Sequence, residues 1–374
     1  DFPFNYEIVI SNDCSKDNTD DVVKNWASKL PIVYEKQKEN IGGLENMEAA
    51  YSRASGVFAM YLADDDFIYK DGLIEAILML ISQSDAVVLY APVKHIELRN
   101  KNSNHYSYEI HEDVVFNKSD FYSVLSLILE HHIFPEVLIF RLAAYKKILP
   151  TTNNISYWAF TKATEWLTLG KVIFKKKPFY CASNSYFEHE QREQLGNEET
   201  EYAWDRYRGG LEHMLSKVFP HLNEEQRLGF TKSIHSFVAS RMLVGLRLRL
   251  SNERNPIDSY YLATRIAGMV DKSRLLFDYE SIREAAAIWY LGNDPNLLRN
   301  KKAIVLFDFD QNSVEAISQK SSIPVFDEKD YVGEYKNLVI LHKENPKQSA
   351  LFYRAEDPSN NTILAEAVLM NKFI

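Results

Sequence analysis

Three consecutive aspartates, Asp64-Asp65-Asp66, follow an apolar run over residues 57–62 that is typical of a buried β-strand. In open parallel sheets ligands bind beyond the carboxyl ends of the strands, which is where this triplet would lie. In an extended chain Asp64 and Asp66 project to the same side, so both carboxylates could converge on one ligand. Such oxygen donors suit Mg²⁺ or Mn²⁺ bound together with a substrate diphosphate. The alternative is a solvated acidic turn that caps the next helix.

A second polar pair, Asn12-Asp13, follows another strand-like run over residues 6–10. The elements that must position both clusters alternate along the chain. Strands are expected over residues 6–10, 32–35, 57–62 and 86–91, with helices over 19–30, 44–54 and 73–81 between them. This alternation predicts an α/β fold with a mostly parallel sheet.

The order and spacing of three motifs resemble those of family 2 glycosyltransferases, which have the GT-A fold. The motifs are Ser11-Asn12-Asp13-Cys14-Ser15 at a strand end, the loop Asn40-Ile41-Gly42-Gly43 with Asn46 and Ala50, and Asp64-Asp65-Asp66 after Gly56 and Met60-Tyr61-Leu62. Asn12 and Cys14 stand where the family usually has Asp and Gly. The resemblance covers about residues 5–190 and predicts a GT-A-like, Rossmann-like domain.

The resemblance also implies roles for these side chains. Asp13, with Asn12 beside it, would contact the base of a nucleotide-sugar donor. Asp64 would approach the ribose or the metal, and Asp65 would lie against the nucleotide-sugar. Asp66 would coordinate the Mn²⁺ or Mg²⁺ that bridges the donor diphosphate.

An acceptor-side motif is expected at Thr164-Glu165-Trp166, before a strand over residues 172–174. Members of the family often have an acidic pair and an aromatic residue here, and the second acid is the general base. Glu165 is therefore the candidate base. The alternative is a helix-surface glutamate that pairs with Lys162.

Further downstream, the segment that ends at His189 resembles a family segment in which the histidine adds a metal or diphosphate contact. Arg192 could neutralise the leaving phosphate. A purely structural histidine is the alternative for His189. His131 and His132 precede a strand and suggest an acceptor-side loop, although such a pair also suits a helix C-terminus.

The chain is expected to contain three parts. Residues 1–196 would form the GT-A domain, residues 197–300 a helical module and residues 301–374 a small α/β module. The first strand-helix unit of the family is expected to be missing, because Asp1 lies directly before what would be the second strand. Asp308 and Asp310, after an apolar strand, leave a phosphatase as a minor alternative, with a strand-end turn as the better interpretation.

Composition limits the remaining function classes. The 374 residues include 43 Lys+Arg and 52 Asp+Glu, a net charge of −9, so no chain-wide basic footprint for nucleic acid exists. Two cysteines far apart in sequence, Cys14 and Cys181, argue against a disulfide framework or a zinc site and fit a reducing compartment. No apolar stretch reaches the roughly 20 residues that span a bilayer. A cytoplasmic protein is expected, with peripheral association at the inner face of the membrane left open.

The resemblance to family 2 glycosyltransferases implies a metal-dependent glycosyltransferase of the hexosyl- or N-acetylhexosaminyl-transferase class. The donor would be a nucleotide-diphosphate sugar, with a UDP-sugar as the first choice, and the acceptor a hydroxyl of a glycan, a lipid-linked glycan or a polymer. The family resemblance implies inversion by single displacement, and homo-oligomer association stays open. The rival is a catalytically idle GT-A-like module that binds a glycan or serves as a scaffold.

Overall fold

The chain forms two compact units, of which unit 1 is Asp1–Val238 and unit 2 is Ala239–Ile374. The structure is a computed structural model that describes residues 2–96, 104–150, 153–183, 200–270, 277–343 and 360–373. Helix α9 (Glu224–Ser251) starts in unit 1 and ends in unit 2. No helix in these described ranges is long and apolar enough to cross a membrane.

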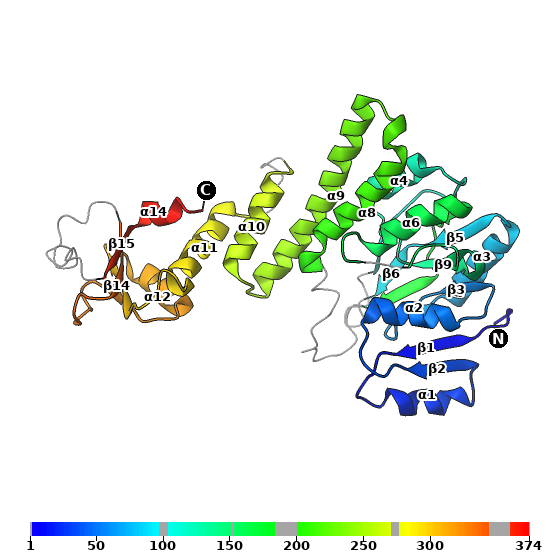
Figure 1. Ribbon diagram of the computed structural model, residues 1–374, viewed down its shortest axis with the longest axis horizontal. Coiled ribbons are helices and arrows are strands. Elements are labelled where there is room, and N and C mark those ends of the chain that lie inside the picture. Colours follow the sequence, from blue (N-terminus) through cyan, green and yellow to red (C-terminus); the bar gives the residue numbers. More distant parts are fainter. Residues whose placement is uncertain are drawn as a thin grey trace. The chain divides into compact units, whose positions relative to one another are not determined.

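Unit 1 begins with a two-stranded parallel sheet (Figure 1). Strand β1 (Ile8–Asn12) pairs in register with β2 (Ile32–Lys36), so that Asn12 lies opposite Lys36. Helix α1 (Thr19–Ala27) connects the two strands, and α2 (Gly43–Arg53) follows them and packs against β1. The predicted alternation of strands and helices is thus present from the first residues.

A five-stranded sheet forms the centre of unit 1. Its order is β3 (Phe58–Met60), β9 (Leu138–Arg141), β5 (Ala86–Tyr90), β10 (Lys171–Phe174) and β8 (Val114–Phe116). All five residues of β5 are buried, as expected for an uninterrupted apolar run in a central strand. Strands β5 and β10 are parallel, while β9 runs antiparallel to β5 and β3.

Unit 1 also contains a four-stranded sheet. Its order is β4 (Phe67–Ile68), β11 (Tyr180–Ser183), β6 (Val93–Ile96) and β7 (Asn104–Tyr106). Helix α3 (Lys70–Ser82) follows β4 directly, and its fully buried Ala76 and Leu80 join the core formed with β5, β9 and β10. The antiparallel pairing of β11 with β4 places Tyr180 opposite Ile68 and Cys181 opposite Phe67.

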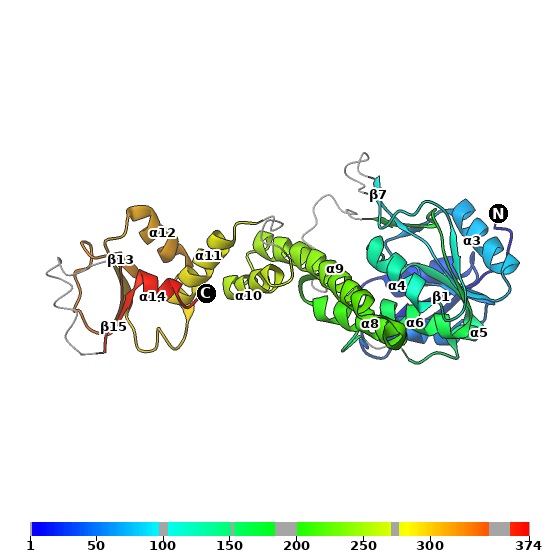
Figure 2. The same cartoon turned by 90° about the horizontal axis from the view of Figure 1, so that it is seen from above.

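Helices cover the central sheet and extend unit 1 beyond residue 196 (Figure 2). They are α4 (Phe121–Glu130), α5 (Leu142–Tyr145), α6 (Trp158–Leu169), α8 (Trp204–Val218) and the short 3₁₀ helix η1 (Phe219–His221). Helix α8 packs against both α6 and α4. The ring of Phe134 lies within 5.1 Å of those of Tyr207 and Phe237, which ties the predicted helical module to the sheet domain.

The unit boundary at Val238 therefore differs from the predicted boundary after residue 196. The sequence change near residue 197 marks a switch from strands to long helices. It does not mark the end of a hydrophobic core, because the buried face of α8 belongs to the core of unit 1.

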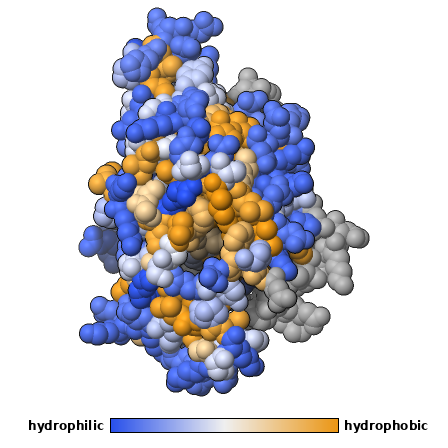
Figure 3. Space-filling model, turned by 90° about the vertical axis from the view of Figure 1, so that its right-hand side faces the viewer, coloured by the Kyte–Doolittle hydropathy of each residue, from blue (hydrophilic) through white to orange (hydrophobic). Residues whose placement is uncertain are grey.

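Strands β1 and β3 each have one hydrogen-bonded strand neighbour in the described part of unit 1, namely β2 and β9. Glu7 joins the beginnings of the two strands, because its Oε1 accepts hydrogen bonds from the N–H groups of Ser55 (2.6 Å) and Gly56 (2.9 Å). Val57, before β3, is 71% exposed. Apolar side chains gather around a hollow on the face seen in Figure 3.

Unit 2 combines helices with a small sheet. After α10 (Pro256–Ala267) and α11 (Tyr279–Asn293) come β12 (Ala303–Phe307), α12 (Gln311–Lys320), β13 (Val325–Asp327), β14 (Leu338–His342), β15 (Thr362–Ala365) and α14 (Glu366–Met370). The sheet order is β13-β12-β14-β15 and every pair is parallel. The predicted α/β class is confirmed, and the predicted small α/β segment after residue 300 forms this sheet.

Candidate functional site

A buried asparagine, Asn12, organises the loop after β1 through its hydrogen bonds. Asn12 is 4% exposed, and its Oδ1 accepts a hydrogen bond from the Ser15 N–H (2.8 Å). Its Nδ2 donates to the hydroxyl of Tyr34 on β2 (2.8 Å). Cys14, which lies between Asn12 and Ser15 in the chain, has a backbone φ of 62°, in the left-handed region that favours glycine. Asn12 thus shapes a tight turn at the strand end.

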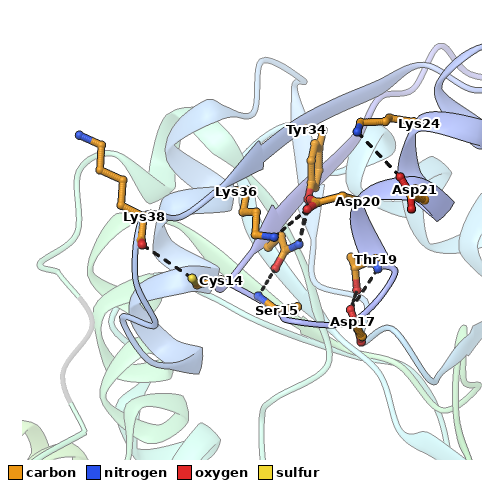
Figure 4. Close-up of polar contacts among 11 residues, drawn as sticks. Cys14, Ser15, Asp17, Thr19, Asp20, Asp21, Lys24, Tyr34, Lys36 and Lys38 are labelled. Atoms are coloured by element: carbon orange, nitrogen blue, oxygen red, sulfur yellow. Dashed lines mark hydrogen bonds and ion pairs between the residues drawn. The ribbon is translucent and has the colours of Figure 1, made fainter.

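Asp20, in the first turn of α1, collects the polar groups around this turn (Figure 4). Its carboxylate accepts hydrogen bonds from the Tyr34 hydroxyl and from Lys36 Nζ (2.6 Å). The Lys36 hydrogen bond is the main reason that the pKa of Asp20 is lowered. Burial, followed by the hydrogen bond to Asp20, raises the pKa of Tyr34. The end of the β1–β2 sheet is thus a connected polar network.

Asp13 fixes the glycine loop that starts α2. Its carboxylate accepts hydrogen bonds from the N–H groups of Ile41 (2.7 Å) and Gly42 (3.1 Å). Gly42 has a φ of 94°, which only glycine adopts readily, and it lies directly before the first residue of α2. Asp13 and the glycine loop, which are 28 residues apart, therefore meet at the end of β1.

The aspartate triplet lies on a turn and not on an extended strand. Strand β3 ends at Met60, and the Asp66 N–H donates to the Ala63 carbonyl (3.3 Å), which closes a four-residue turn. Asp64 and Asp65 occupy the two central positions of this turn and are exposed. The expectation that Asp64 and Asp66 project to one side of an extended strand is therefore wrong, because the chain bends before the triplet.

Asp66 is held by strand β11. Its Oδ2 accepts a hydrogen bond from the Tyr180 hydroxyl (2.7 Å), and its Oδ1 accepts one from the Ser183 N–H (3.0 Å). The Tyr180 oxygen itself accepts the Ala63 N–H (3.0 Å). Tyr180 is 4% exposed, and burial is the main reason that its pKa is raised, with the Asp66 carboxylate adding to the effect.

The donor set around the triplet fits a hard divalent cation. Each carboxylate oxygen of Asp66 keeps a second lone pair beside its hydrogen bond. Asp64 adds a second, exposed carboxylate. Burial, followed by the charges of the three aspartates, raises the pKa of the nearby Tyr61, so the turn is a region of negative potential. The described residues contain no group of three or more His, Cys, Asp or Glu side chains placed to hold a metal. Such an ion would therefore need donor oxygens from a substrate, as Mg²⁺ commonly does.

Glu165 lies in α6 beside Lys162, with 3.6 Å between Glu165 Oε2 and Lys162 Nζ. Burial raises the pKa of Glu165 and lowers that of Lys162. Lys162 also donates to the Leu149 carbonyl and lies over the ring of Tyr145 (5.4 Å).

Tyr145 belongs to α5, which follows the end of β9. At that end Arg141 Nε donates to the carbonyl of Ala86, the first residue of β5 (2.7 Å). The amino end of β5 is opposite to the edge at which ligands bind in parallel sheets. The contacts of Glu165 therefore favour the ion-pair interpretation.

Two of the predicted site residues, His189 and Arg192, lie outside the described residues, and His131 and His132 are within them. His131 caps the C-terminus of α4, as the sequence allowed, and the ring of His132 stacks on Phe237 at 5.2 Å.

Asp310 in unit 2 is a helix cap. Its carboxylate accepts hydrogen bonds from the N–H (2.9 Å) and the hydroxyl (3.2 Å) of Ser313 at the start of α12. The backbone hydrogen bond from Ser313 is the main cause of its lowered pKa. Asp308 has a φ of 63° in the turn before it. These contacts support the strand-end turn that the sequence favoured over a phosphatase site.

Comparison with known proteins finds a family that the first part of the chain resembles. Residues 2–149 match the family model described as glycosyl transferase family 2. This segment of the chain is therefore similar to family 2 glycosyltransferases. It includes both polar clusters, Asn12-Asp13 and Asp64-Asp65-Asp66, whereas Tyr180 and Glu165 lie after it.

Two curated relatives match part of this chain. The abequosyltransferase RfbV of Salmonella typhimurium is 31% identical over 106 residues, which are 26% of this chain and 31% of the relative. The poly(ribitol-phosphate) beta-N-acetylglucosaminyltransferase TarS of Staphylococcus aureus is 31% identical over 91 residues, 24% of this chain and 16% of the relative. The chain thus spans less than a third of each of these proteins.

Solved structures of glycosyltransferases align over more of the chain at low similarity. S. aureus TarS 1–349 aligns with a TM-score of 0.41 at 15% identity, over 76% of this chain and 83% of that one. The mannosyltransferase PcManGT of Pyrobaculum calidifontis, in complex with GDP-Man and Mn²⁺, aligns with a TM-score of 0.40 at 13% identity, over 76% and 77% of the two chains.

The sequence alone did not indicate the hydrogen-bond partners of Asp66. Tyr180 is 114 positions away from Asp66, and it lies in a short strand whose pattern is that of any buried strand. The contact depends on the antiparallel pairing of β11 with β4, and no local motif indicates such a pairing.

Proposed function

We propose that this chain transfers a sugar from a nucleotide-diphosphate donor, with a UDP-sugar as the first choice, to a hydroxyl of a glycan, a lipid-linked glycan or a polymer. The observation that carries the proposal is the similarity of residues 2–149 to family 2 glycosyltransferases. The two curated relatives are named as an abequosyltransferase and an N-acetylglucosaminyltransferase, which supports transfer of a hexosyl or N-acetylhexosaminyl group.

The proposed donor site combines the two polar clusters of the domain. Asn12 and Asp13 organise the turn and the glycine loop against which the nucleotide would lie. Asp66 and Asp64 would hold Mn²⁺ or Mg²⁺, and Asp65 would lie against the sugar nucleotide. When bound, the cation stabilises the negative charge that develops on the departing diphosphate.

Inversion by single displacement requires a general base within hydrogen-bond reach of the attacking hydroxyl. The base takes the hydroxyl proton as the acceptor oxygen bonds to the anomeric carbon and the bond to the diphosphate breaks. Glu165 is the candidate from the family resemblance, and its pairing with Lys162 is the argument against it. The variant Glu165→Gln separates these alternatives.

Calorimetric titration of the chain with UDP, in the presence of Mn²⁺ and in EDTA, tests the donor site. Asp66→Asn keeps the size of the side chain but removes a carboxylate, so it should abolish the metal-dependent part of UDP binding. The matched variant Asp65→Asn, on the same turn, should have a milder effect. A screen of nucleotide-sugar donors scored by nucleotide release would then identify the sugar.

Two outcomes would contradict this assignment. Wild-type protein that binds UDP equally in Mn²⁺ and in EDTA would favour a metal-independent donor site. Asp66→Asn protein that keeps wild-type UDP affinity with Mn²⁺ would place the metal site elsewhere.

A further inference from the structure

We infer that Tyr180 is a positioning residue that fixes the Asp66 carboxylate for metal-dependent donor binding. This inference rests on the proposed function. The Tyr180 hydroxyl donates to Asp66 Oδ2 (2.7 Å) and accepts the N–H of Ala63 (3.0 Å), so one oxygen bridges the first and last residues of the aspartate turn.

The remaining contacts of the turn come from the same strand. The Ser183 N–H donates to Asp66 Oδ1 (3.0 Å), so β11 contacts both carboxylate oxygens. Immediately after the turn, Phe67 and Ile68 of β4 pair with Cys181 and Tyr180. Two kinds of contact therefore hold Asp66 in place. The β4–β11 pairing holds the backbone that follows it, and two hydrogen bonds hold its carboxylate.

Such outer contacts decide how a carboxylate presents its free lone pairs. Without the Tyr180 hydroxyl, the Asp66 side chain would have to be ordered by the metal itself, and binding would bear that entropic cost. Removing a partner of a metal-binding side chain typically weakens metal affinity by about 10–100-fold. Tyr180 is 4% exposed, so water has little access to compete with Asp66 for the hydrogen bond from its hydroxyl.

The variant Tyr180→Phe removes the hydroxyl and keeps the ring in the core. Tyr90→Phe is a matched control, because Tyr90 is buried in β5 and its hydroxyl has no hydrogen-bond partner among the described residues. We would measure the Mn²⁺ concentration that gives half-maximal UDP binding, UDP affinity in EDTA, and the melting temperature of each protein.

Tyr180→Phe is expected to need about 10–100-fold more Mn²⁺ than wild type, with UDP affinity in EDTA unchanged. Tyr90→Phe should need the same Mn²⁺ concentration as wild type. A purely structural role would lower the melting temperature without changing the Mn²⁺ requirement. An unchanged Mn²⁺ requirement in Tyr180→Phe would overturn the inference and leave the proposed function intact. Wild-type protein without Mn²⁺-dependent UDP binding would instead remove the proposed function itself.

A double-mutant cycle covers the case in which Tyr180→Phe is too unstable for titration. The loss of melting temperature caused by Tyr180→Phe should be smaller in an Asp66→Asn background than in wild type, because the charged acceptor is already gone. Equal losses in the two backgrounds would show that the Tyr180 hydroxyl does not stabilise the protein through Asp66 and would overturn the inference.

Discussion

At the scale of single residues, the turn after β1 depends on Cys14 in a left-handed conformation, with a φ of 62°. A residue with a Cβ destabilises the folded state by about 1–2 kcal/mol in this conformation, whereas glycine costs about 0.5–1 kcal/mol because it loses more backbone entropy on folding. We expect Cys14→Gly to raise the free energy of unfolding by up to about 1 kcal/mol and the β-branched Cys14→Val to lower it by more than about 1 kcal/mol. Urea unfolding measures both. Equal stabilities of the three proteins would mean that the turn relaxes to another conformation.

The general base is a second question at this scale. The carboxylate of Glu165 is paired with Lys162 at the side of the sheet where β5 begins. We therefore expect Glu165→Gln to keep both UDP binding and transfer to a working acceptor within about threefold. Removal of a true general base would lower the transfer rate by about 10²–10⁴ while sparing donor binding. Rates at saturating donor distinguish the two cases, and a loss of that size would establish Glu165 as the base.

These residues show which parts of a site can be predicted from the sequence. Asn12 and Asp13 are identified because their types and order match a family motif. The motifs also contain their partners Ser15, Ile41 and Gly42, but they do not indicate which of these groups are hydrogen-bonded. Asp13 contacts Ile41 and Gly42, and Asp66 contacts Tyr180, across 28, 29 and 114 positions. The motifs predict which side chains lie at the site, whereas the fold determines the hydrogen bonds that position those side chains.

At the scale of elements, the packing of α8 on α6 depends on a glycine. A Cβ at Gly210 would lie 2.8 Å from the Cβ of Phe160 and 3.0 Å from the Tyr157 carbonyl, so an added methyl group requires the helices to separate. Such overpacking costs about 1–3 kcal/mol, more than the roughly 1 kcal/mol that alanine gains over glycine within a helix.

We therefore expect Gly210→Ala to lower the free energy of unfolding by about 1–2 kcal/mol. Gly229→Ala is the control, because Gly229 is exposed in α9 and a Cβ there meets nothing within 4 Å. That variant should raise stability by about 0.5–1 kcal/mol. Thermal unfolding compares them, and a stabilising Gly210→Ala would show that α6 and α8 are packed less closely than described.

Local patterns predicted most elements, and the failures have physical causes. The strand predicted over residues 86–91 is present as β5, and the helix predicted over residues 73–81 lies within α3. The strand predicted over residues 57–62 ends at Met60. Tyr61 and Leu62 are apolar, but within the described part of the chain they pair with no strand, and they are 48% and 43% exposed. Apolar character alone does not distinguish a paired residue from an exposed one next to a functional turn.

At the scale of the whole chain, the position of the unit boundary determines which shortened chains can fold. Helix α8 lies beyond the predicted boundary at residue 196, yet its packing is part of unit 1. Its buried apolar side chains are Trp204, Tyr207, Leu211, Met214, Leu215 and Val218. Each contributes about 1.5–3 kcal/mol when fully buried, so together they contribute on the order of 10 kcal/mol, comparable with the whole stability of an ordinary domain.

A chain that ends at residue 197 should therefore lose its cooperative thermal transition and aggregate, because the faces of α4 and α6 that contact α8 become exposed. A chain that ends at residue 251 keeps α8 and the whole of α9, so no helix is cut in the middle. We expect this longer chain to melt cooperatively and to bind UDP with Mn²⁺ as tightly as the full chain, since both polar clusters, Asn12-Asp13 and Asp64-Asp65-Asp66, lie within unit 1. Circular dichroism and calorimetry of the two shortened chains measure these outcomes. Cooperative melting of the 197-residue chain at the temperature of the 251-residue chain would restore the boundary predicted from the sequence. Loss of UDP binding in a folded 251-residue chain would show instead that unit 2 contributes to the donor site.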